Sequence, residues 1–208
     1  MARVSQQHLD ARRRQILDGA ARCFARNGFH ATSMQDVLRE VDLSAGAVYR
    51  YFGSKEELIG AIVTEVLDSV RQAFEEAALQ SPPDPPDVLV GEVIGRVLRG
   101  ESVPGAVVGI EMPRLLIQVW GETLRNESLA ALLRTGYDTV RVAWVKVVEA
   151  YQAAGLMRDD VPAEHVARTM IAAVQGFAAQ QALFGEAPVE ILQDGLRGLM
   201  SMGAQRAG

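Results

Sequence analysis

Apolar residues recur at intervals of three and four along most of this 208-residue chain, which is the spacing of amphipathic helices. A first helix is predicted over residues 10–27, because Asn27-Gly28 offers a left-handed stop after the last apolar position. The apolar positions of this helix are Ile16, Leu17, Ala20, Cys23 and Phe24. Few segments alternate between apolar and polar residues as a strand would, so the pattern predicts an all-α fold of about nine helices.

Two short helices are predicted directly after the first. Ser33 and Asp36 stand at capping-box spacing at the start of the second helix. Its apolar positions are Met34, Val37, Leu38 and Val41. The tight turn Asp42-Leu43-Ser44 separates this helix from a third, which Ser44 caps and Gly53 ends. Two short helices joined by such a turn are typical of the helix-turn-helix motif.

The rest of the chain is predicted to be a helical bundle. Ser54-Lys55-Glu56-Glu57 is a full capping box that opens a long fourth helix, and the proline-rich residues 81–86 cannot be helical. The helices predicted beyond them cover residues 87–99, 104–126 with a kink or restart at Pro113, 127–154, 162–184 and 188–202. The chain therefore divides into residues 1–57, a helix-turn-helix domain, and residues 58–208, a helical body.

Charge is divided unevenly between these two parts. The whole chain has a net charge of -5, but residues 1–55 hold nine arginine and lysine residues against five aspartate and glutamate residues. The head is thus net +4 and the remainder net -9. A basic head on an acidic body favours an approach to phosphate by the head alone.

The third helix has one small, polar face. At 100° per residue Gly46 and Arg50 point away from the predicted inner side, which consists of Ala45, Val48 and Phe52. Small residues at the start of the helix allow its backbone to approach base edges, Ala47 suits a thymine methyl, and Arg50 suits guanine or phosphate. The residues predicted to contact DNA are Thr32, Ser33, Ser44, Ala45, Gly46, Ala47, Tyr49, Arg50, Tyr51 and Lys55.

Several of these residues are predicted to bind phosphate. Tyr49, Tyr51 and Lys55 supply donors around the groove, and Ser44 forms an anion site with the free amides at the start of its helix. Thr32 and Ser33 are expected to do the same at the second helix. The alternative that the two tyrosines simply pack at the helix edge stays open.

The segment from Arg13 to Leu58 resembles the TetR (tetracycline-repressor-like) family of bacterial regulators. The matching features are Ile16-Leu17, Ala20-Ala21, Phe24-Ala25, Gly28-Phe29, Thr32, Ser44-Ala45-Gly46, Val48-Tyr49, Tyr51-Phe52 and Ser54-Lys55-Glu56-Glu57-Leu58. Asp42 stands where such regulators usually have the turn glycine, and aspartate tolerates the left-handed conformation. The resemblance implies a homodimer on a near-palindromic operator, usually a repressor that a small molecule bound in residues 58–208 releases from double-stranded DNA.

Arg12, Arg13 and Arg14 are predicted to lie in the first turn of the first helix, where the helix dipole disfavours cations. An external anion would explain them, so one hypothesis is that they and Arg3 contact the DNA backbone or minor groove. The alternative is a solvated cluster of charges.

The last two predicted helices offer a small, apolar surface. Paired with the same helices of a second chain, they would form a four-helix interface, which agrees with the resemblance. The residues predicted at this interface are Ala167, Ile171, Val174, Ala178, Ala182, Leu192, Leu196 and Leu199. The alternative is that these faces are used entirely inside one chain.

A ligand pocket is predicted among the helices between Val88 and Val148, where bulky apolar side chains stand near polar ones. The residues predicted to bind ligand are Met112, Gln118, Trp120, Tyr137, Arg141 and Trp144, with Arg134 as a further polar anchor. Large aromatic residues at helical spacing are also typical of a core, so that alternative stays open.

Catalysis and metal binding find no support in the sequence. The three histidines are scattered, Cys23 is the single cysteine on a predicted buried face, and no phosphate-binding loop is present, so no cofactor, metal or enzyme activity is predicted. No apolar stretch reaches the roughly 20 residues of a membrane span, and a cytoplasmic protein is expected. The rival readings are a DNA-binding adaptor whose body binds a protein partner and a helical enzyme with an incidental helix-turn-helix.

Overall fold

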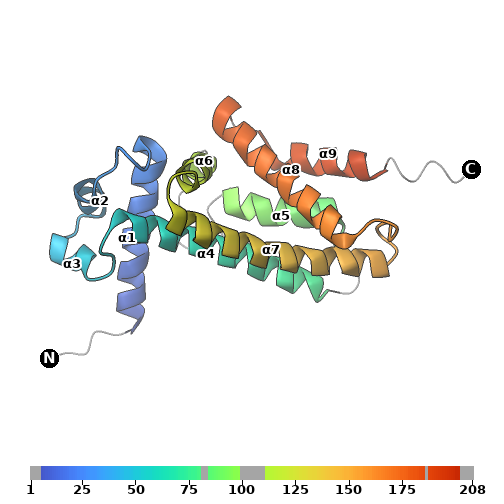
Figure 1. The fold of residues 1–208 in the computed structure, drawn as a ribbon, viewed down its shortest axis with the longest axis horizontal. Coiled ribbons are helices and arrows are strands. Elements are labelled where there is room, and N and C mark those ends of the chain that lie inside the picture. The colour runs from blue at the N-terminus through green and yellow to red at the C-terminus, as the bar shows by residue number, and fades with distance from the viewer. Residues whose placement is uncertain (1–5, 81–83, 99–110, 186, 202–208) are drawn as a thin grey trace, which may run out of the picture.

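The computed structural model describes residues 6–80, 84–98, 111–185 and 187–201, and within these ranges it contains nine α-helices and no strand (Figure 1). The helices are α1 (Gln6–Asn27), α2 (Met34–Val41), α3 (Ala45–Tyr49), α4 (Lys55–Ala78), α5 (Pro86–Leu98), α6 (Glu111–Thr123), α7 (Glu127–Ala153), α8 (Ala163–Phe184) and α9 (Val189–Ser201). The predicted all-α fold is confirmed.

The three helices α1, α2 and α3 form a head at one end of the molecule (Figure 1). The α2 helix begins with the predicted capping box: the Asp36 amide donates to Ser33 Oγ at 3.2 Å, and the Ser33 amide donates to the Asp36 carboxylate at 2.8 Å. It ends at Asp42, which adopts the left-handed conformation with φ 52° and ψ 50°. Asp42 therefore performs the role that the turn glycine has in the resembling family.

The α3 helix is shorter than predicted. It ends at Tyr49, and the chain continues as a turn in which the Tyr51 amide donates to the Val48 carbonyl at 2.9 Å. This hydrogen bond spans three residues, as in a 3₁₀ turn, instead of the four of an α-helix. The tighter turn is why the regular helix does not reach Gly53. The Phe52 amide still donates to the Val48 carbonyl at 3.1 Å, so Phe52 reaches the core as predicted and is 5% exposed.

The long helix α4 belongs to two hydrophobic cores. Leu58 and Ile59, in its first turns, pack with α1, α2 and α3, and the same cluster takes in residues of α6. Phe74 and Ala77, near its end, pack with α5, α7, α8 and α9 in a second cluster. The head and the body are therefore joined by a continuous helix whose two ends are both buried.

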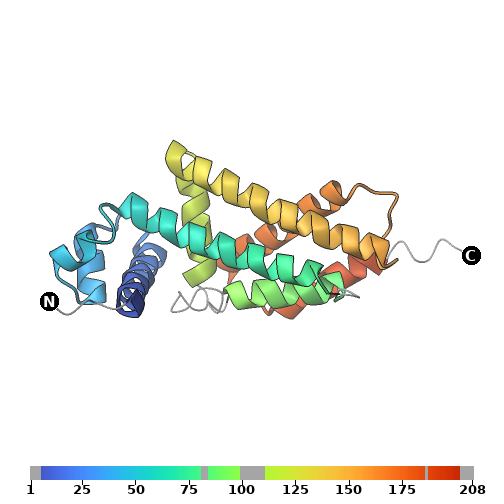
Figure 2. The same cartoon turned by 90° about the horizontal axis from the view of Figure 1, so that it is seen from below.

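The body is built around α4 and α7, which lie side by side and run in the same direction (Figure 2). Leu132 lies beside Gly60 at one end, and the rings of Phe74 and Trp144 stack at the other with centroids 4.3 Å apart. The α8 helix packs against α6 and α7, and α9 packs against α5. None of the helices in the described ranges is long and apolar enough to cross a membrane.

The body helices follow the predicted ranges closely, each beginning or ending within one or two residues of the expected position except α6. The first part of the helix predicted over residues 104–126 lies outside the described residues, as does residue 202. Pro113 is the third residue of α6 as described, so the predicted kink there also concerns undescribed neighbours.

Candidate functional site

The small, polar face of α3 is open to solvent. A Cβ atom built on Gly46 meets no other atom within 4 Å, and Arg50 is exposed with no hydrogen bond or ion pair to another described residue. Tyr49 is 49% exposed, whereas Val48 on the opposite side is fully buried. The predicted division between an outer face and an inner anchor is therefore present, although Ala45 lies on the exposed side.

Two residues predicted to contact DNA are held inside the head instead. Thr32 is 2% exposed, and its hydroxyl donates to the carbonyls of Gly28 at 2.8 Å and Cys23 at 3.2 Å. The Lys55 ammonium donates to the carbonyls of Phe29 at 3.0 Å and Thr32 at 3.3 Å and lies 4.5 Å from the Phe29 ring centroid. Both side chains therefore bond carbonyls within the head, a structural role that the prediction of phosphate contacts did not include.

Ser33, predicted as part of an anion site, is already bonded within the head. The Ser33 hydroxyl donates to the Asp36 carboxylate at 2.6 Å, and this carboxylate already occupies the start of α2. The hydrogen bonds from Ser33 hold the pKa of Asp36 below its ordinary value, so the carboxylate stays charged and repels an external anion. Ser44 differs, since its Oγ only accepts from the Ala47 amide at 3.3 Å and its hydroxyl is exposed.

The arginines of α1 do not lie in its first turn. The helix already includes Gln6, so residues 12–14 fall in its second and third turns, and the dipole argument for an external anion is wrong. Arg13 pairs with Glu65 of α4 and lies 5.6 Å from the Phe52 ring centroid, so it fastens α1 to two neighbours. Burial raises the pKa of nearby Asp18 to about 6, against the opposing charge of Arg22.

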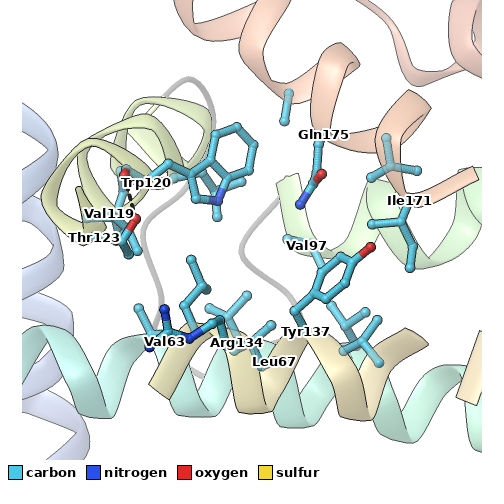
Figure 3. Close-up of a pocket in the computed structure, with 18 of the residues that line it drawn as sticks. Val63, Leu67, Val97, Val119, Trp120, Thr123, Arg134, Tyr137, Ile171 and Gln175 are labelled. Carbon is cyan, nitrogen blue, oxygen red and sulfur yellow. Dashed lines mark hydrogen bonds between the residues drawn. The ribbon is translucent and has the colours of Figure 1, made fainter. Parts of the chain in front are cut away.

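A cavity of about 830 Å³ lies in the body between α4, α6, α7 and α8 (Figure 3). Its lining is mostly aliphatic and aromatic, and Figure 3 shows Trp120, Tyr137 and Gln175 pointing into it from three different helices. The volume is within the range of about 300–1,000 Å³ that small-molecule sites usually have. The geometry therefore suits a largely apolar molecule.

Four of the six residues predicted to bind ligand line this cavity: Met112, Trp120, Tyr137 and Trp144. Gln118 does not line it and faces the head. Arg141 does not line it either, because its guanidinium donates to Glu164 at 2.6 Å and to Asp138 at 3.4 Å. These two predictions are not supported by the geometry.

The prediction missed two walls of the cavity. One is the apolar stripe of α4, and the other is a face of α8. The residues are Ile62, Val63, Val66, Leu67, Val70 and Phe74 on α4, and Ile171, Val174, Gln175 and Ala178 on α8. Both stripes are visible in the sequence, but no ligand contact was predicted on α4, and Ile171, Val174 and Ala178 of α8 were predicted at a dimer interface.

The residues predicted at that interface differ in burial. Ala167, Ala178 and Leu196 are at most 6% exposed within one chain, so they offer little surface to a second chain. Ile171, Val174 and Leu192 are half-buried against the second core. Leu199 is 69% exposed and Ala182 is half-buried.

Leu199 is the predicted interface residue whose large apolar side chain is exposed on α8 and α9. Three side chains that were not predicted there, Leu183, Phe184 and Ile191, are 66%, 82% and 59% exposed. A Cβ atom on Gly176 or Gly195 would also meet nothing within 4 Å. These residues together define an outward face of small and apolar residues, to which Leu199 also belongs.

One helix connects the cavity to the head. On one face of α6, Val119, Trp120 and Thr123 line the cavity. On another face the Glu122 carboxylate, whose side chain is 7% exposed, lies 2.8 Å from Nε2 of His30 in the loop between α1 and α2. Gln118, one turn earlier, lies against Gly28 of the same loop, so α6 contacts both sites directly.

No group of three or more histidine, cysteine, aspartate or glutamate side chains that would hold a metal ion occurs in the described part of the chain. The fold and the exposed face of α3 define a helix-turn-helix DNA-binding regulator.

Comparison with known proteins identifies its family. Residues 16–62 match the family of bacterial regulatory proteins, tetR family, and residues 101–199 match the C-terminal domain of BetI-type transcriptional repressors. The chain belongs to the TetR family of transcriptional regulators, which are DNA-binding proteins and not enzymes.

Individual relatives agree with this assignment. The chain is 42% identical over 73 residues to the HTH-type transcriptional repressor Rv1474c of Mycobacterium tuberculosis, a match that spans 35% of this chain and 38% of that protein. It is 25% identical over 167 residues to the regulator UidR of Escherichia coli, 80% of each chain. The solved structure of Salmonella enterica GusR superposes with a TM-score of 0.73 at 28% identity, covering 96% of this chain and all of that one.

Proposed function

We propose that this regulator is a repressor, that it binds a near-palindromic operator as a homodimer, and that a small molecule in the body cavity releases it. The observation that carries the proposal is the placement of α6, which lines the cavity with one face and contacts the head with another. A ligand that shifts α6 would move the loop between α1 and α2 and with it the orientation of the head.

The outer face of α3 is the part of the head that suits the major groove. Gly46 leaves room for close approach, Arg50 has a free guanidinium, and Ser44, Ala45 and Ala47 flank them. Tyr49 is placed to donate to a phosphate at the edge of the same groove. Tyr51 is half-buried against the head core, so less of its side chain is accessible to DNA than that of Tyr49.

A second copy of the chain would pack on the outward face of α8 and α9. The open positions at Gly176 and Gly195 allow two helices to approach closely, and Phe184 and Ile191 supply apolar area that is exposed in one chain. Such an isologous four-helix contact would fix the distance between two heads on DNA. Replacing both Phe184 and Ile191 by glutamate should leave a folded monomer.

Operator binding is tested with the DNA upstream of the protein's own gene, by fluorescence anisotropy at two salt concentrations. Arg50→Ala should weaken binding by about 1–3 kcal/mol, the usual value of a specific base contact. Arg96→Ala, which removes the same charge from an exposed position on α5, is the matched control and should have little effect. Equal affinities for the two variants would contradict the placement of α3 in the groove.

The adaptor alternative has less support. An adaptor whose body binds only a protein needs no internal cavity, whereas the volume of about 830 Å³ would leave apolar side chains without packing partners. A small molecule that fills this space explains why it is maintained.

A further inference from the structure

The lining of the cavity extends along several turns of two neighbouring helices. Its lining on α4 extends from Ile62 to Phe74, about 18 Å at a rise of 1.5 Å per residue, and on α7 from Ala130 to Trp144, about 21 Å. The two helices run side by side in the same direction, so these lengths describe one channel. A volume of about 830 Å³ spread over this length suits an extended molecule better than a round one.

The two ends of the channel differ in chemistry. At the end away from the head, the stacked rings of Phe74 and Trp144 are at most 4% exposed, and Val140 and Ile94 complete an apolar surface. At the end near the head, the lining contains the polar side chains of Thr123 and Arg134 beside the highly exposed Leu124. The lining is therefore apolar and buried at the end away from the head, and polar and more exposed at the end near the head.

Arg134 is the cation of this lining that has no partner. Its guanidinium forms no hydrogen bond or ion pair with any residue that the structure describes. Asp138, one turn later on α7 and also in the lining, already accepts from Arg141 at 3.4 Å. Figure 3 places Arg134 at the edge of the cavity, below Trp120.

We propose that the effector is an elongated, apolar molecule with a single carboxylate, which binds with the carboxylate on Arg134 and the apolar body toward Phe74 and Trp144. This inference rests on the proposed ligand response and names the class of ligand. A guanidinium binds a carboxylate through two parallel N–H donors, and the apolar lining favours the remainder of the molecule by removing it from water. The side chains of Trp120 and Gln175 offer further donors on the way.

The test compares three probes with the same twelve-carbon chain and different head groups: sodium dodecanoate, 1-dodecanol and dodecyltrimethylammonium chloride, each below its aggregation threshold. The readout is intrinsic tryptophan fluorescence of the full chain, because Trp120 and Trp144 are the two tryptophans of the sequence and both line the cavity. Dodecanoate should bind about tenfold more tightly than either other probe, as a charge-assisted hydrogen bond allows.

Arg134→Gln should remove this preference for the carboxylate and leave the affinity for 1-dodecanol unchanged, which also shows that the cavity is intact. Lys146→Gln is the matched control, since Lys146 is an exposed cation on α7 that does not line the cavity. Equal binding of the three probes, preference for the cation, absence of binding, or an unchanged preference in Arg134→Gln would each overturn the inference.

Release of DNA is measured separately on the same samples. Binding of dodecanoate without any change in operator affinity would contradict the proposed ligand response and leave the ligand class standing. Release by 1-dodecanol with no advantage for dodecanoate would support the response and overturn the carboxylate class.

Discussion

The contact between His30 and Glu122 should couple the head to the body in a measurable way. The Glu122 side chain is 7% exposed and the His30 side chain 60%, with 2.8 Å between Oε2 and Nε2. A hydrogen bond to a charged group contributes about 1.5–3 kcal/mol when both partners are shielded. Because His30 is largely solvated, we expect a smaller coupling of about 1 kcal/mol.

The assay is a double-mutant cycle. The free energy of unfolding in urea is measured at one fixed pH for the parent chain, His30→Ala, Glu122→Gln and the double variant. The double variant should be less destabilised than the sum of the two single variants by about 1 kcal/mol. The single variants should also alter operator affinity in the same direction, since each frees the loop between α1 and α2 from α6.

Arg125→Gln is the control for this cycle. Arg125 reaches the same Glu122 carboxylate at 3.9 Å from a position just beyond α6, and it forms no hydrogen bond or ion pair with a described residue of the head. It should therefore change stability slightly and leave DNA binding alone. Additivity of His30→Ala and Glu122→Gln within about 0.3 kcal/mol would refute the link between α6 and the head.

Three further outcomes follow from other contacts. Asp18→Asn should stabilise the protein at pH 7.5, because burial raises the pKa of Asp18 to about 6 and the charged carboxylate is disfavoured in the fold. The gain in Tm should shrink as the pH falls from 6 to 4, and a gain that grows over this range would contradict the raised pKa. Thr32→Val should lower the free energy of unfolding by about 1 kcal/mol in urea and leave the salt dependence of DNA binding unchanged, since its hydroxyl donates to loop carbonyls. Gly136→Ala should weaken the binding of dodecanoate measured by fluorescence, because the new Cβ would lie 2.2 Å from Leu67 Cδ1 and push the Leu67 side chain into the cavity. Unaltered binding would show that Leu67 moves elsewhere.

The head was predictable because its signals are local. Ser33 and Asp36 are three residues apart, Asp42 is a single residue in a turn, and Gly28 ends α1 with φ 82°. Each of these features depends on neighbours in the sequence, and the structure contains all of them. The exposed face of α3 followed from the same short-range geometry.

The structure adds what the sequence did not indicate where a side chain finds its partner far along the chain. Lys55 donates to carbonyls 23 and 26 residues earlier, and Arg141 pairs with Glu164, 23 residues later. A free cation and a paired one look the same in the sequence, so Arg134 and Arg141 were both predicted as polar anchors of the pocket. Only the packing of α7 against α8 distinguishes them.

The faces of α8 were ambiguous for a different reason. This helix has small or apolar residues on several sides, so its periodicity does not say which side meets the core, the cavity or a second chain. The structure assigns Ala167 and Ala178 to the interior and leaves Gly176 and Leu183 outside.

Because α4 contributes to both hydrophobic cores, it limits how the chain can be divided into stable fragments. A fragment that ends at residue 57 would lose four buried residues of the head core: Leu58, Ile59, Ile62 and Val63. Its α1 would also lose Glu65 as the counter-charge of Arg13. The DNA-binding head is thus not an independent domain. A chimeric protein that joins it to another body must include the first half of α4 and must provide a new surface for α1 where α6 now lies.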